Sequence, residues 1–137
     1  MQIATRRAGV PHARSLTRWA NAAYAGTGEL TIRVIGAAES RKLNRTWRGK
    51  DKPTNVLSFG GNGDIPDFLG DLAICAPVVA REAREQGKSP AAHWAHMVVH
   101  GVLHLLGYDH ENDRDAKRME ARETKILAQL GMPNPYV

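Results

Sequence analysis

The segment NVLSFGGNGDIPDFLGDLAICA, residues 55–76, decides the fold. Its first part, residues 55–60, and its last part, residues 69–76, are short and rich in apolar residues, so each predicts a β-strand. The glycines and the proline between them, in residues 60–67, are typical of a turn. We therefore expect the two strands to pair as a hairpin with a long connecting loop.

Two more strands and two helices are predicted before this hairpin. Residues 30–36, LTIRVIG, alternate in polarity and contain β-branched residues, which predicts a strand, and residues 2–5 are a candidate first strand. Residues 11–25 predict a helix, with Pro11 in its first turn, and residues 37–47 predict a shorter one. The expected apolar stripe of the first helix consists of Leu16, Trp19, Ala20 and Ala23.

Three further helices are predicted after the hairpin. They run from Pro77 to Gly87, from Pro90 to about Leu106, and from a cap at Asn112 or Asp113 to Gly131. Ser89 is the expected N-cap of the second of these helices, and Gly107 is expected just beyond its end. Strands come first and helices later, so the sequence predicts an α+β fold, with helices layered on a small sheet in one domain, residues 1–137.

Composition narrows the class of protein. The chain has 137 residues, of which 42% are hydrophobic and 24% charged, as in a soluble globular domain with a single core. Its one cysteine, Cys75, excludes an internal disulfide framework and is expected to be a small buried hydrophobe. With no apolar signal-peptide core and no run long enough to cross a membrane, we expect a cytoplasmic protein.

The positive charge is concentrated in residues 41–52, RKLNRTWRGKDK. This segment has six basic residues against one acidic residue, while the net charge of the whole chain is +5. Such a concentration predicts a phosphate-binding face, and the alternative is a solvated helix end with no partner. Trp47, in the same segment, could stack on a nucleobase, but beside an apolar stripe a place in the core is favoured.

The segment HGVLHLLGYDH, residues 100–110, has the spacing of a metal site. His100 and His104 lie one turn apart on a helix, and Gly107 supplies the turn that brings His110 back to the same point. Three imidazoles leave a position open on a tetrahedral ion, which is typical of a catalytic zinc site. We therefore predict one divalent metal ion, with zinc favoured, although nickel, copper and cobalt accept the same ligands.

Other residues near this motif have expected roles outside the ligand set. His96 lies about 12 Å from His104 along the helix axis, so His93 and His96 are treated as flanking residues. Asp109 either orients a ligand imidazole or caps the turn.

Gly101 indicates what the metal site does not do. In helical metalloprotease motifs a glutamate follows the first histidine and acts as the general base, and glycine cannot take that role. Glycine is also about 1 kcal/mol less favourable than alanine inside a helix. Its presence indicates a close approach by substrate or by packed backbone, and the motif points away from peptide hydrolysis.

Four segments, in order and spacing, resemble the YbeY-type endoribonucleases, the bacterial rRNA maturation factors. They are LNRTWRGKDKPTNVLSF at 43–59, LGDLAI at 69–74, HGVLHLLGYDH at 100–110, and an M-x3-E-x2-IL pattern at Met119, Glu123, Ile126 and Leu127. Together they span most of the chain from about residue 30 onward. The chain departs from the family at Gly60–Gly61, where members commonly carry proline, so the resemblance does not define the following loop.

The resemblance implies a mixed sheet of about four strands with about five helices around it. It also implies a divalent metal held by His100, His104 and His110, and an essential arginine at Arg48. The implied activity is cleavage of single-stranded RNA in 16S rRNA 3′-end maturation and ribosome quality control. The implied partners are the small ribosomal subunit with its proteins and a ribosome-associated GTPase.

We therefore expect a metal-dependent endoribonuclease that acts on neither DNA nor membranes. The ion would polarise a phosphoryl oxygen or activate water, and Arg48 would stabilise charge on the phosphate, because its planar fork suits that group. Five other basic residues would follow the RNA backbone. They are Arg41, Lys42, Arg45, Lys50 and Lys52. The alternatives are a non-catalytic rRNA-binding assembly factor with a structural metal and, with less support, a metalloprotease.

Overall fold

The structure, a computed structural model, describes residues 2–3, 9–26, 28–60 and 68–137. In that part of the chain it has four strands and five helices. In chain order they are β1 (Gln2–Ile3), α1 (Ala13–Ala23), β2 (Glu29–Ile35), α2 (Ala37–Arg48), β3 (Val56–Gly60), β4 (Phe68–Cys75), α3 (Ala76–Glu85), α4 (Pro90–Leu105) and α5 (Asp113–Gln129). The predicted α+β fold is confirmed. Residues 4–5 of the expected first strand lie outside the described residues.

The sheet is mixed, with the strand order β1-β2-β4-β3. β1, β2 and β4 run parallel to one another, and β3 pairs antiparallel with β4, with Val56 opposite Ile74 and Gly60 opposite Gly70. This confirms the predicted hairpin and leaves β3 as an edge strand. Residues 61–67, which hold most of the expected glycine-rich loop, including Gly61, are outside the described part.

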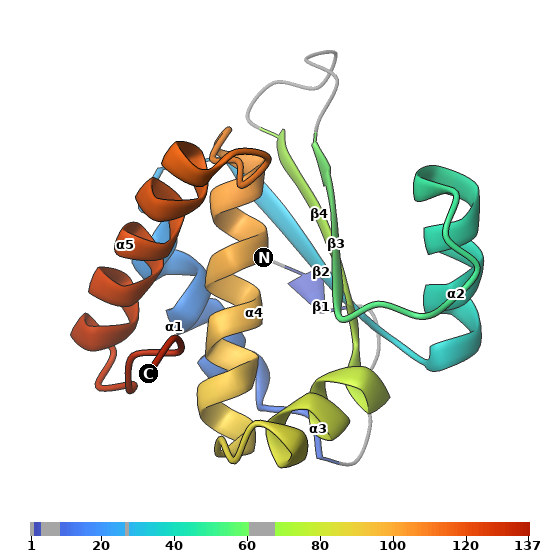
Figure 1. The fold of residues 1–137 in the computed structure, drawn as a ribbon, viewed down its shortest axis with the longest axis horizontal. Helices are drawn as coiled ribbons and strands as arrows, with labels where there is room; N and C mark the ends of the chain where they lie inside the picture. Colours follow the sequence, from blue (N-terminus) through green and yellow to red (C-terminus); the bar gives the residue numbers. More distant parts are fainter. Residues whose placement is uncertain (1, 4–8, 27, 61–67) are drawn as a thin grey trace.

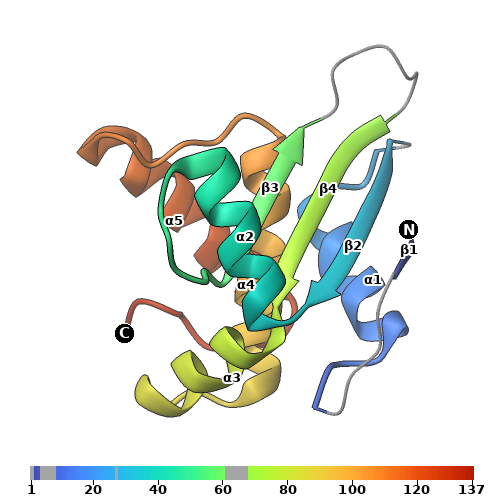
Figure 2. The ribbon, with the colours of Figure 1, turned by 90° about the vertical axis from the view of Figure 1, so that its right-hand side faces the viewer.

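Helices cover both faces of the sheet (Figure 1). α4 packs on one face, with α1 and α5 beyond it, and α2 lies on the other face (Figures 1 and 2). Residues of β4 alternate accordingly. Leu72 and Ile74 join the large core with α1, α4 and α5, while Ala73 and Cys75 join a smaller core beneath α2. The expected burial of Cys75 is confirmed.

α4 is the central helix, and its residues from Ala92 to Val99 are all buried. It begins as predicted, because the side chain of Ser89 accepts a hydrogen bond from the backbone N–H of Ala92. It ends where Gly107 adopts a φ of +96° and the backbone N–H of Tyr108 donates to the carbonyl of Leu103. No helix in the described ranges is long and apolar enough to span a bilayer.

α1 is shorter than predicted, whereas its buried stripe is as expected. His12 and Tyr24 both have extended backbones, so the helix begins at Ala13, after Pro11, and ends at Ala23. Pro11 therefore lies before the helix and not in its first turn. The four predicted apolar positions of the stripe are all buried.

Candidate metal centre

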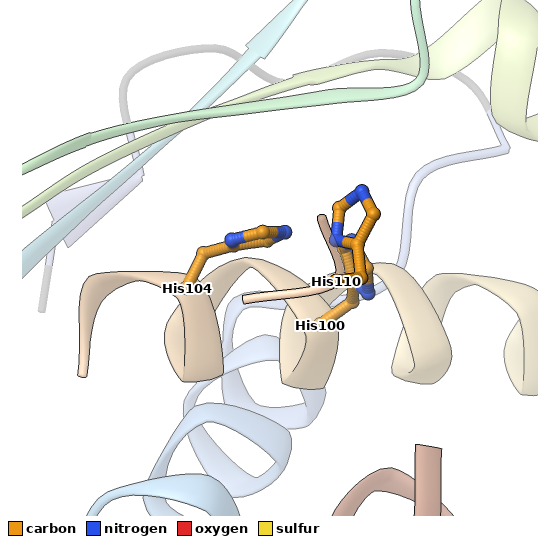
Figure 3. A group of neighbouring side chains, drawn as sticks. All are labelled: His100, His104 and His110. Atoms are coloured by element: carbon orange, nitrogen blue, oxygen red, sulfur yellow. The ribbon is translucent and has the colours of Figure 1, made fainter. Parts of the chain in front are cut away.

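Three imidazoles meet at the C-terminal end of α4 (Figure 3). His100 and His104 are one turn apart, and the turn at Gly107 brings His110 back beside them. The ring centroids are 4.7 Å apart for His100 and His104, 4.8 Å for His104 and His110, and 5.6 Å for His100 and His110. One ring nitrogen from each histidine lies within 4.8 Å of the others. This donor set suits one divalent ion such as zinc.

The ring of His100 is oriented by a buried carboxylate on α5. Its Nδ1 lies 2.8 Å from Oε2 of Glu123, a side chain that is only 1% exposed. An ionised carboxylate can only accept, so Nδ1 carries the proton and donates it. In a neutral imidazole this leaves Nε2 as the nitrogen with the free lone pair, which is the atom that can bind a metal.

Glu123 is held by two further donors. Nε2 of His96 lies 3.0 Å from Oε2, and the hydroxyl of Tyr136 donates to Oε1 at 2.6 Å. Burial acts to raise the pKa of Glu123, but hydrogen bonds from His100, His96 and Tyr136 outweigh it and hold this pKa at about 2. The carboxylate is therefore ionised. His96, His100 and Glu123 also lie close enough to hold an ion, but Nε2 of His96 and Nδ1 of His100 both already lie against Oε2 of Glu123. Nδ1 of His96 is buried without a hydrogen-bond partner among the described residues.

The other two histidines of the cluster differ in environment. His104 is half-buried, and burial together with the neighbouring imidazoles of His100 and His110 lowers its pKa. It is therefore neutral, as a metal ligand must be. His110 is exposed, and its backbone N–H donates to Oδ1 of Asp109 at 2.7 Å. For Asp109 the structure shows this local hydrogen bond to the following residue.

A cleft of about 520 Å³ opens over these imidazoles, between β3 and α4. Its lining consists of Arg48, Asn55, Val56, Leu57, Ser58, Gly60, His100, His104, Leu105 and His110. Arg48 is the last residue of α2, and it lines this cleft together with residues of the edge strand β3. Within the described residues Arg48 forms no ion pair, so its guanidinium is available to an anionic ligand. The structure thus brings Arg48 and the three histidines to one cavity.

The five other basic residues lie outside the cleft lining and are exposed on α2 and the segment after it. Arg41 donates to both carboxylate oxygens of Asp51, at 2.8 and 2.9 Å, and Arg45 lies 3.8 Å from the same group. The hydrogen bond from Arg41 lowers the pKa of Asp51. Lys42, Lys50 and Lys52 have no ion pair in the described ranges, so these lysines carry most of the unpaired positive charge of the segment.

Trp47 is 67% exposed, so the favoured interpretation as a core residue is wrong. The buried stripe of α2 runs along Ser40 and Asn44, and its last turn extends to the edge strand of the sheet. There the Trp47 ring meets only the edge of Phe59, with centroids 6.0 Å apart and planes at 71°.

Gly101 allows α4 to approach the sheet closely. A Cβ at this position would lie 2.7 Å from Cδ2 of Leu72, and the hydroxyl of Ser58 donates to the Gly101 carbonyl at 3.1 Å. The close neighbours of this glycine are therefore packed side chains of the sheet, Leu72 and Val56. The glutamate of a helical metalloprotease motif has no room at this position.

The roles of Glu123 and Tyr136 were not predicted. Glu123 gave a signal in the sequence, because it falls in the apolar stripe of α5 with Met119, Ile126 and Leu127, and a carboxylate at a core position requires partners. Tyr136 lies beyond the last helix, and no local pattern indicates its contact with Glu123.

Comparisons with known proteins show the family of this chain. The sequence model of the family described as "Endoribonuclease YbeY" matches residues 10–131. A protein of that name from Halorhodospira halophila is 56% identical over 138 residues, covering 94% of this chain and 90% of its own. One from Nitrosomonas eutropha is 48% identical over 137 residues, covering 100% and 96%. A solution structure from Thermotoga maritima shares the fold, with a TM-score of 0.56 at 23% identity over 95% of this chain and 90% of its own. The chain therefore belongs to the Endoribonuclease YbeY family.

Proposed function

We propose that this chain is a cytoplasmic, metal-dependent endoribonuclease that cuts single-stranded RNA, with residues 1–137 acting as one domain. The observation that carries the proposal is the meeting of three imidazoles and an unpaired arginine, Arg48, in one cleft. Family membership supports the choice of RNA as the substrate, since the relatives are named endoribonucleases.

His100, His104 and His110 would hold one divalent ion, most simply zinc. When bound, such an ion supplies Lewis-acid activation of the scissile phosphate. Arg48 binds a non-bridging oxygen of that phosphate and stabilises the charge that develops during cleavage. Glu123 keeps Nδ1 of His100 protonated and so keeps the opposite nitrogen directed to the ion.

The RNA backbone would follow the exposed basic residues of α2 and the segment after it. Lys42, Lys50 and Lys52 offer unpaired charge, whereas Arg41 and Arg45 must share theirs with Asp51. Contacts of this kind follow phosphates with little sequence preference and weaken with added salt. As the biological substrate we propose the 3′ end of 16S rRNA, in maturation and ribosome quality control. A ribosome-associated GTPase and small-subunit proteins are the proposed partners.

Two features weigh against the alternatives. The tight packing at Gly101 leaves no place for a protease-type glutamate next to His100. A purely structural metal would be expected in a closed site, but His110 is exposed and the cleft reaches the histidines from outside. Both features favour a metal that substrate can approach.

The test is cleavage of a labelled single-stranded RNA by the highly purified protein and by His104→Ala. His12→Ala, which removes an exposed histidine outside the cluster, is the matched control. We expect the wild type and His12→Ala to cut the RNA, and His104→Ala to lose cleavage. Equal cleavage by all three proteins would identify a contaminating nuclease and refute the proposal. Wild-type protein that binds the RNA and the metal without cutting would instead support the assembly-factor alternative.

A further inference from the structure

Trp47 is the largest apolar side chain exposed on the described part of the chain. At 67% exposure it contrasts with the two other tryptophans, Trp19 and Trp94, which are 4% and 2% exposed. Its contact with Phe59 is edge-to-face, with the planes at 71°, so this contact covers at most one face of the indole. An exposed indole held against a second aromatic ring is a suitable platform for stacking.

The surroundings of Trp47 favour a nucleic acid over an apolar protein segment as the occupant. Arg48 follows it directly, and Lys50 and Lys52 come shortly after, all of them exposed. Positive charge beside an exposed aromatic ring is the combination by which proteins bind single-stranded nucleic acid: the charge attracts phosphates, and the ring stacks on a base. An apolar peptide would leave these charges without partners.

The position of Trp47 relative to the cleft is set by β3. Its ring contacts Phe59, whose neighbours in the strand, Ser58 and Gly60, both line the cleft above the histidines. Ser58 faces α4, because its hydroxyl donates to Gly101, and Phe59 packs with the smaller core beneath α2. Trp47 and the histidine cluster therefore flank one short segment of the edge strand. Trp47 itself is outside the cleft lining, but Arg48, the next residue in the chain, is part of it.

We propose that Trp47 is a nucleobase-stacking subsite, on which a base of a single-stranded RNA rests while Arg48 holds a nearby phosphate in the cleft. This inference rests on the proposed function for the identity of the ligand. It adds a reason for single-strand preference, because the bases of a duplex are already stacked on one another and cannot reach the indole.

Binding at Trp47 can be followed as quenching of tryptophan emission, since the two other tryptophans are buried away from a ligand and their emission is given by the Trp47→Phe variant. A short 2′-O-methyl oligoribonucleotide, which resists cleavage, is titrated into the metal-loaded protein, and binding is measured in parallel by anisotropy of a label on the oligonucleotide. We expect binding to quench the tryptophan emission of the wild type. Trp47→Phe should bind with similar affinity but without quenching. Trp47→Ala should bind at least about fivefold more weakly. Thr46→Ala, a change at the exposed neighbouring residue, should bind as the wild type does.

An abasic oligonucleotide of the same length separates stacking from other effects. We expect wild type and Trp47→Ala to bind the abasic strand with equal affinity, because it offers no base to the indole. Saturating binding that leaves the tryptophan emission unchanged would overturn the proposal. It would instead favour a protein as the partner of the exposed ring. Equal weakening of the normal and abasic strands in Trp47→Ala would overturn it as well. Both measurements report binding and not cleavage. Their outcome is therefore independent of the His104→Ala test, which measures catalysis.

Discussion

Nδ1 of His100 lies 2.8 Å from Oε2 of Glu123, and this contact ties the histidine cluster at the end of α4 to α5. Oε1 of the same carboxylate accepts from the hydroxyl of Tyr136, near the C-terminus. The orientation of the His100 imidazole, a proposed metal ligand, therefore depends on residues well beyond the histidine motif. A histidine ligand whose second nitrogen donates to a carboxylate is a recurrent arrangement at zinc sites, because it fixes the proton away from the metal.

Glu123→Gln should weaken metal binding while keeping the fold. An amide nitrogen facing Nδ1 of His100 favours the opposite tautomer, which places a proton on the nitrogen needed by the metal. We expect zinc affinity to fall about 10- to 100-fold, measured by competition with a chromophoric chelator. Glu120→Gln, on the same helix, is the matched control and should bind zinc as the wild type does. Unchanged zinc affinity in Glu123→Gln would contradict the assigned role.

Arg48→Ala should lower kcat by about 10²-fold or more, as expected when a preorganised donor to the transition state is removed. Arg48→Lys should recover only part of this loss, because lysine lacks the planar fork. Arg45→Ala, three residues earlier on α2 and outside the cleft lining, should change KM more than kcat. Single-turnover cleavage of labelled RNA measures these effects. If the kcat of Arg48→Ala equals that of Arg45→Ala, Arg48 has no role in the catalytic step.

The pH dependence of stability should contain a contribution from His93. This side chain is 2% exposed, and its Nε2 lies 2.8 Å from Oε1 of Glu82. Burial lowers the pKa of His93 below its ordinary 6.5; Glu82 opposes this effect, while His96 and Lys88 add to it. The unfolded chain therefore takes up this proton first as the pH falls. Stability is retained above about pH 6.5 and lost as the pH drops through the lowered pKa.

His93→Gln removes this titration. The free energy of unfolding of the wild type should fall more steeply between about pH 7 and pH 5 than that of the variant. Urea denaturation at several pH values measures both slopes. The other titrating groups are common to the two proteins, so identical slopes would show that His93 does not carry the effect.

Gly101→Glu should unfold the protein and not produce a peptidase. The new side chain would enter the packed contact between α4 and Leu72, and a buried unpaired carboxylate typically costs more than about 4 kcal/mol. Gly101→Ala should be milder, because overpacking by about 1–3 kcal/mol is partly offset by about 1 kcal/mol of helix propensity. Thermal unfolding of the two variants tests this order. A Gly101→Glu protein as stable as the wild type would show that the helix does not pack this closely.

Local patterns predict the elements and the clustering of the three histidines because both depend on short-range geometry. The Ser89 cap, the turn at Gly107 and the one-turn spacing of His100 and His104 all act within a few residues. The elements and their order could therefore be predicted, with errors of only one or two residues at helix ends such as that of α1.

Contacts between distant segments could not be predicted in the same way. The bond from Tyr136 to Glu123 depends on how the C-terminal segment folds back on α5, which no local pattern specifies. The interpretation of Trp47 is wrong for a related reason: its helical spacing is that of a buried stripe, but at the last turn of α2 its ring lies against Phe59 of the edge strand and is otherwise largely exposed. The pairing of Arg41 with Asp51 likewise divides a basic segment that looks uniform in the sequence.

The most direct test of the account is the metal content of the purified protein and its three histidine variants, by mass spectrometry of the metal and by thermal unfolding. The wild type should carry a single divalent ion, and removing the ion with a chelator should lower its midpoint of unfolding, since a ligand that binds only the folded state stabilises it. His100→Ala, His104→Ala and His110→Ala should each lose the ion, and the chelator should no longer change their unfolding. A wild type without bound metal, or a His104→Ala protein that keeps both the ion and its response to chelator, would contradict the central claim.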